Sequence, residues 1–172
     1  SDVAKSRSKV FWYRSKNRES MATYPDVAKS MNLAFTAYYK PATGLIMLRE
    51  YIIGHERFDN AFKDYIKNWS YKHPQPSDFF NEIDNGTGEN LNWFWRGWFL
   101  GNGNIDLGIS NVAQEKGAAI ITFTNKGDIP MPVVFKVVYD DDSSEIKTLP
   151  VEVWQRSNEC DYLLRSDKKV KA

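Results

Sequence analysis

The spacing of apolar residues changes near Gly101, and this change constrains the fold more than any other feature of the sequence. Before Gly101, apolar residues recur every three or four positions, as they do on one face of a helix. After Gly101 they alternate with polar residues, as in strands that bury one face of a sheet. We therefore predict an α+β chain in two parts, with a helical bundle over residues 1–103 and antiparallel strands over residues 104–172.

Four helices are expected in the first part. Pro41 suits the first turn of a helix because its missing N–H needs no partner there. Gly54 suits the end of that helix, where the backbone often turns left-handed. The predicted helices span residues 41–53, 56–69, 77–83 and 91–100, and a loop is expected over residues 85–88.

Short alternating runs separated by turn residues follow Gly101. Such runs at intervals of about 8–12 residues predict an antiparallel, immunoglobulin-like β-sandwich. A complete sandwich of this kind has about seven strands. Five or six are visible, so we expect the sandwich to be incomplete. The apolar runs lie at residues 105–109, 119–123 and 133–137, from residue 146, and at residues 151–153.

Composition excludes several classes of protein. Hydrophobic residues make up 42% and charged residues 26% of the 172 positions, which are ordinary values for a globular chain. The net charge of +1 provides no general attraction for nucleic acid or acidic membranes. No apolar run approaches the roughly 20 residues that span a bilayer. The single cysteine, Cys160, is expected to be structural, since its acidic neighbours disfavour a thiolate.

The first thirty residues combine basic side chains with the aromatic run Phe11-Trp12-Tyr13. Basic and aromatic residues together can bind single-stranded nucleic acid. Nothing later in the chain extends this patch, so we interpret the segment as one that docks its aromatic face on the domain. We expect no nucleic acid partner.

Only two histidines, His55 and His73, are available for catalysis or metal binding. The string that begins at His55 resembles the zinc motif H-E-x-x-H, but Asp59 occupies the place of the second imidazole. His73 lies in a proline-rich loop, and no nucleophile elbow is present. We therefore expect no metal site and no catalytic triad, and the chain by itself should not be an active enzyme.

The aromatic run from Trp93 to Phe99 has two interpretations. Its density resembles a platform for sugar binding. Its apolar residues, however, point to nearly every side of a helix, which is typical of a buried helix. We predict that this helix belongs to the core.

Several segments together resemble the C-terminal half of aminopeptidase N-type zinc metallopeptidases, the gluzincins of peptidase family M-one. The resemblance depends on the order and spacing of these segments and covers about residues 24–164. The matching strings are Tyr38 to Glu50, Arg57 to Tyr65, Pro76 to Phe80, Leu91 to Phe99 and Thr124 to Val133.

This resemblance implies a fragment of an enzyme that hydrolyses amino-terminal peptide bonds, with residues 1–103 as the helical end of its catalytic domain. The family's zinc motif and the glutamate that completes the zinc ligands are expected upstream, outside this sequence. Zinc would then be a cofactor of the full-length protein only. Peptide substrates and the upstream catalytic subdomain would be the partners of this chain, and an extracytoplasmic or periplasmic location is consistent with the resemblance.

The resemblance carries one catalytic residue over to this sequence, Tyr39. In the family, the corresponding hydroxyl donates a hydrogen bond to the oxyanion of the tetrahedral intermediate. Tyr39 is expected at a helix N-terminus, where the partial positive charge also favours an anion. Tyr38 is the alternative if the register is shifted by one residue. An alternative function from another class is a non-catalytic interaction module that retains the peptidase fold.

Overall fold

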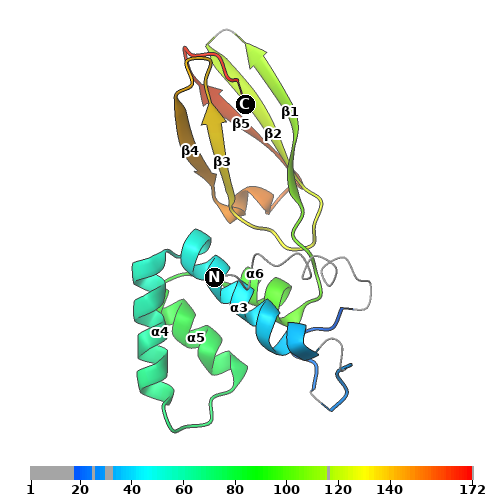
Figure 1. Ribbon diagram of the computed structural model, residues 1–172, viewed down its shortest axis with the longest axis vertical. Coiled ribbons are helices and arrows are strands. Elements are labelled where there is room, and N and C mark those ends of the chain that lie inside the picture. The colour runs from blue at the N-terminus through cyan, green and yellow to red at the C-terminus, as the bar shows by residue number, and fades with distance from the viewer. Residues whose placement is uncertain (1–17, 25, 30–32, 116, 172) are drawn as a thin grey trace. The chain divides into compact units, whose positions relative to one another are not determined.

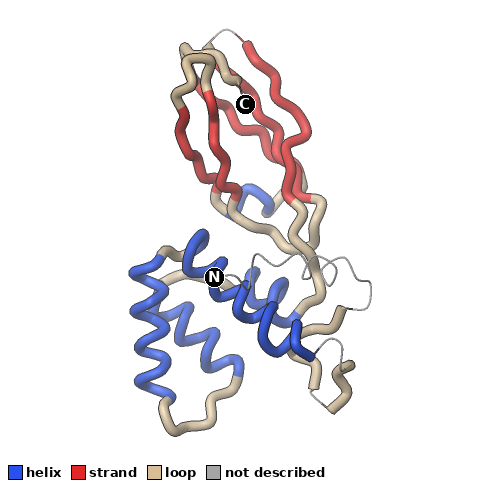
Figure 2. The backbone as a smooth tube through the Cα atoms, in the orientation of Figure 1, coloured by secondary structure: helices blue, strands red, loops and turns tan. Residues whose placement is uncertain are grey.

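A computed structural model describes residues 18–24, 26–29, 33–115 and 117–171 (Figure 1). The chain divides into two compact units, Ser1–Asn102 and Gly103–Ala172. The described part of the first unit is helical, and the second contains antiparallel strands, as the colours of Figure 2 show. The predicted α+β class is therefore confirmed. Among the described residues, no helix has the length and apolar character that crossing a bilayer requires.

The first long helical run begins earlier than predicted. It contains a π-helical segment, Phe35–Tyr39, followed by helix α3 (Lys40–Met47) and a second π-helical segment, Leu48–Ile52. The expected start at Pro41 is wrong, because helical backbone already precedes it from Leu33 onward, although proline has no N–H to donate to the helix. Pro41 thus lies inside a continuous helical run.

Two further helices pack against each other (Figure 1). Helix α4 (His55–Trp69) agrees with its prediction, whereas helix α5 (Pro76–Thr87) is four residues longer at its C-terminal end than the predicted 77–83. The expected loop over residues 85–88 is therefore wrong. The Thr87 hydroxyl donates to the carbonyl of Ile83, and the helix ends at Gly88, which adopts a left-handed conformation with φ of 68°.

The last helical run of the first unit forms its aromatic core. It consists of the short helix α6 (Asn92–Phe94) and a π-helical segment, Trp95–Leu100. Phe94, Trp95 and Trp98 are buried, and the rings of Phe94 and Trp98 stack at 6.2 Å. The indole N–H of Trp95 donates to a carboxylate oxygen of Asp84 at 2.7 Å. The aromatic run is thus core and does not form an open platform.

Five strands build two antiparallel sheets in the second unit. One sheet has the order β1-β2-β5 and the other pairs β3 with β4. The short strand expected at residues 151–153 is wrong, because a 3₁₀ helix, Val151–Trp154, follows Pro150, and strand β5 was not expected at all. The strands are β1 (Leu107–Glu115), β2 (Ala118–Asn125), β3 (Val133–Val138), β4 (Ser144–Leu149) and β5 (Glu159–Arg165).

The two sheets share one hydrophobic cluster. The ring of Phe135 in β3 lies 4.8 Å from that of Phe123 in β2 and 5.4 Å from that of Tyr162 in β5. Trp154 closes the cluster, and its indole N–H donates to the carbonyl of Met131 at 2.8 Å. Cys160 is a free, half-buried cysteine packed against the same cluster.

Candidate functional site

Tyr38 and Tyr39 lie together in the π-helical segment that precedes α3. The side chain of Tyr38 is 71% exposed and that of Tyr39 is 38% exposed. The ring of Tyr39 lies 5.4 Å from that of Phe35, and its carbonyl accepts a hydrogen bond from the Thr43 hydroxyl at 2.8 Å. Both tyrosines therefore reach the surface of the first unit.

The expected position of Tyr39 at a helix N-terminus is wrong. Helical turns from Leu33 onward precede it, and its own backbone is helical. The partial positive charge of a helix N-terminus is confined to the first turn. This charge therefore cannot contribute to binding an anion at Tyr39.

Lys40, the next residue, is only 2% exposed. Its ammonium Nζ donates to the carbonyl of Gly101 at 2.8 Å and lies 5.6 Å from the centre of the Trp98 ring. The indole N–H of Trp98 donates in turn to the carbonyl of Lys40 at 3.0 Å. These contacts join the start of α3 to the end of the aromatic run, and sequence patterns had not indicated a role for Lys40.

Burial, together with the positive charge of Arg18, lowers the pKa of Lys40 to about 8. Arg18 has a buried NH1 nitrogen that finds no hydrogen-bond partner in the part of the chain that the structure describes. Neither cation forms an ion pair with a carboxylate among the described residues. Two buried or half-buried cations therefore share one region of the first unit.

An apolar cavity of about 320 Å³ lies beside this region. Helical residues Thr36, Ala37 and Pro41 form one side of it, and the aromatic residues Phe79 and Phe99 contribute to its lining. The cavity contains no pair of ionisable groups, so it is suited to an apolar group and not to proton transfer.

The residues of the incomplete zinc motif have other partners. Nε2 of His55 lies 2.7 Å from a carboxylate oxygen of Glu50, whereas Arg49 holds Asp59 through two hydrogen bonds of 2.7 and 2.9 Å. The hydrogen bond from Arg49 holds the pKa of Asp59 below its usual value. His73 is exposed on the loop before α5. Within the described ranges, no three metal-binding side chains lie close enough to hold a metal ion.

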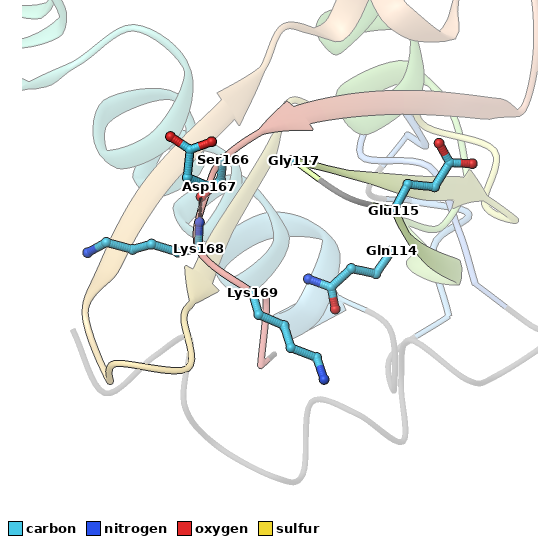
Figure 3. Close-up of a pocket in the computed structure, with 7 residues that line it drawn as sticks. All are labelled: Gln114, Glu115, Gly117, Ser166, Asp167, Lys168 and Lys169. Atoms are coloured by element: carbon cyan, nitrogen blue, oxygen red, sulfur yellow. Dashed lines mark hydrogen bonds between the residues drawn. The ribbon is translucent and has the colours of Figure 1, made fainter.

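The second unit carries a polar hollow of about 310 Å³ near the end of β5 (Figure 3). Figure 3 shows its two carboxylates, Glu115 and Asp167, well apart. The ammonium of Lys168 is held by Asp141 at 2.6 Å and by the Ser143 hydroxyl at 2.9 Å. The hollow therefore offers no converging catalytic groups.

Comparison with known proteins identifies the class. Residues 6–98, more than half of the chain, match the family model described as Peptidase family M1 domain. The chain therefore belongs to peptidase family M1. The comparison with curated proteins gives no match.

A solved structure is similar in fold. It is the crystal structure of Legionella pneumophila aminopeptidase A in complex with aspartic acid, with a TM-score of 0.57 and 14% sequence identity. The match covers 80% of this chain and 16% of the Legionella chain. At this identity the likeness concerns the fold alone, and this chain spans about one sixth of the length of that protein.

Proposed function

We propose that the intact protein is a zinc-dependent aminopeptidase that hydrolyses amino-terminal peptide bonds. The observation that carries this proposal is the family match over residues 6–98, which includes the helical run with Tyr38 and Tyr39. This chain would be the C-terminal part of the catalytic region together with the sheets that follow it. Alone, it would be inactive.

The zinc ion of the proposed enzyme would be bound by residues outside this chain. The two histidines do not fit a shared metal site, since His55 pairs with Glu50 and His73 is on a separate exposed loop. Zinc in such enzymes acts as a Lewis acid toward the reacting groups. No step of that chemistry is assigned to the residues of this chain.

The contribution proposed for this chain is a hydrogen bond from the Tyr39 hydroxyl. Attack on a peptide carbonyl places negative charge on its oxygen, and a donor that contacts this oxygen stabilises the transition state more than the substrate. The partly exposed side chain of Tyr39 is accessible to such a group. The more exposed Tyr38 fills the same role if the register differs by one residue.

We also propose that the second unit is an immunoglobulin-like sandwich. Its support is the shared hydrophobic cluster, which takes residues from both antiparallel sheets. Five strands are fewer than the seven of a complete sandwich of this type.

Substitution of the two tyrosines tests the catalytic assignment in the intact enzyme. Tyr39→Phe removes one hydroxyl and should leave the fold and zinc content unchanged. It should lower kcat by about 10²–10³, or roughly 2.7–4 kcal/mol, with little change in KM. Tyr38→Phe is the matched control and should be much milder. Steady-state hydrolysis of an aminoacyl anilide measures both variants.

The outcomes separate the alternatives. Loss of activity in Tyr38→Phe alone would retain the peptidase and shift the catalytic role to Tyr38. Near wild-type rates in both variants would remove the role of these tyrosines. If an intact, zinc-loaded protein does not hydrolyse a panel of aminoacyl anilides and short peptides, the peptidase proposal is wrong. The alternative function, a non-catalytic interaction module, is then favoured.

A further inference from the structure

The side chain of Lys40 and the backbone around Arg18 both contact the end of the aromatic run. The ammonium of Lys40 donates to the carbonyl of Gly101 at 2.8 Å. The carbonyl of Arg18 accepts a hydrogen bond from the Asn102 side chain at 3.2 Å, and the Ser20 hydroxyl donates to Leu100 at 2.8 Å. The segment around Arg18 and the side chain of Lys40 therefore meet at residues 100–102.

The positive charge at this place is not balanced. Lys40 is almost fully buried, and the buried NH1 of Arg18 has no hydrogen-bond partner among the described residues. A carbonyl at a helix C-terminus and the face of a tryptophan carry only partial negative charge. A buried cation normally acquires a full counter-charge or loses its proton.

No described carboxylate supplies that counter-charge, as the ion pairs of the described residues involve neither Lys40 nor Arg18. Residues 1–17, whose structure is outside the described ranges, contain one carboxylate, Asp2, and five basic residues. On balance this segment adds positive charge. A full counter-charge for these two cations would therefore come from Asp2 or from another molecule.

We propose that Arg18 and Lys40 form a binding site for a carboxylate group, which bridges NH1 of Arg18 and Nζ of Lys40. A planar guanidinium and an ammonium together match the two oxygens of a carboxylate, and hydrogen bonds between charged groups are strong. The site is independent of the proposed peptidase activity, since it uses neither Tyr39 nor zinc.

Acetate titration of the 172-residue chain tests this proposal. The indole N–H of Trp98, which donates to the carbonyl of Lys40, is the reporter in ¹H–¹⁵N NMR spectra. Acetate replaces chloride at constant ionic strength and pH 6.5, where Lys40 is protonated. We expect a saturable shift of the Trp98 signal. Arg18→Gln should weaken binding by about tenfold or more, because one charge-assisted hydrogen bond is lost. Arg96→Gln, which removes an exposed cation from the same aromatic run, should leave it unchanged.

A second arm identifies the source of the carboxylate. If Asp2 fills the site, the wild-type chain responds weakly to acetate, and Asp2→Asn strengthens acetate binding by about tenfold or more. If a separate molecule fills it, Asp2→Asn has no effect and the wild-type chain already binds acetate. Absence of a saturable response in both proteins would overturn the proposal, as would equal affinity in Arg18→Gln.

A third measurement requires no substitution at Arg18. Acetate in the site places a negative charge beside Lys40. The pKa of Lys40 should therefore rise from about 8 at saturating acetate, in whichever of the two proteins, wild type or Asp2→Asn, binds acetate. NMR titration of the Lys40 side chain follows this change. An unchanged pKa at saturating acetate would overturn the proposal even if Arg18→Gln fails to fold.

Discussion

At the scale of single residues, Lys40 combines burial with a positive charge. Its pKa is about 8 in the folded chain, against an ordinary value of 10.5. Between these values the unfolded chain binds more protons than the folded chain, so the free energy of unfolding should rise with pH across this window. Below about pH 8, burial of the protonated Lys40 side chain lowers the free energy of unfolding by its full amount, up to roughly 3 kcal/mol.

Lys40→Met tests this expectation because it removes the ammonium and retains the apolar stem. The rise in stability between about pH 8 and 10.5 should be smaller in this variant than in the wild-type chain, without added carboxylate. Urea unfolding followed by tryptophan fluorescence measures the difference at several pH values. Lys67→Met, which removes an exposed lysine of α4, is the control. An equal rise in Lys40→Met and the wild-type chain would contradict the burial cost.

The amino-acid types at positions 39 and 40 did not by themselves indicate a catalytic role for Tyr39 or the burial of Lys40. Tyr39 was selected through the family resemblance, and its catalytic role stays a prediction. Its expected place at a helix N-terminus was wrong, because Pro41 indicated a start that the preceding helical turns override. Lys40 carried no signal of burial, since a lysine between Tyr39 and Pro41 is most often exposed.

At the scale of elements, Gly44 controls how α3 packs on the aromatic run. A Cβ atom at this position would lie 2.4 Å from Nε1 and 2.6 Å from Cδ1 of Trp98. Such overpacking costs about 1–3 kcal/mol, whereas alanine improves helix propensity by at most about 1 kcal/mol. Gly44→Ala should therefore lower the free energy of unfolding by about 1–2 kcal/mol, measured by urea unfolding.

Gly108→Ala is the matched control, because the nearest atom to its added Cβ is the Thr124 hydroxyl oxygen at 3.6 Å. It should change stability by less than about 0.5 kcal/mol. If Gly44→Ala is as stable as the wild-type chain, the close approach of α3 to Trp98 is not as tight as described.

The predicted elements differ in how well local signals define them. Helix α4 was predicted correctly because its apolar stripe is long and regular. The end of α5 was wrong because Asn85 and Gly86 are typical of loops, although Gly86 lies where a Cβ would approach that of Ala61 at 2.8 Å. Close helix packing thus explains a glycine inside a helix, and local sequence does not carry that information.

At the scale of the whole molecule, the proposal that the zinc ligands lie outside this sequence makes a prediction about metal content. The 172-residue chain should not retain stoichiometric zinc after dialysis, because the described residues do not bring three metal ligands together. Inductively coupled plasma mass spectrometry measures this directly. One tightly bound zinc ion per chain would contradict the proposal that the zinc ligands lie outside this sequence.

The sequence by itself determined the α+β class and the helical and strand-forming halves, because apolar periodicity is a local property of the chain. Tertiary structure alone decided which polar groups are buried together. The hydrogen bond from Lys40 to Gly101 joins residues 61 positions apart, and that from Asn102 to Arg18 spans 84. Contacts over such separations depend on how the segments of the first unit pack, so no local pattern indicates them. The burial of Lys40 and the influence of the Arg18 charge on it therefore depend on the tertiary structure.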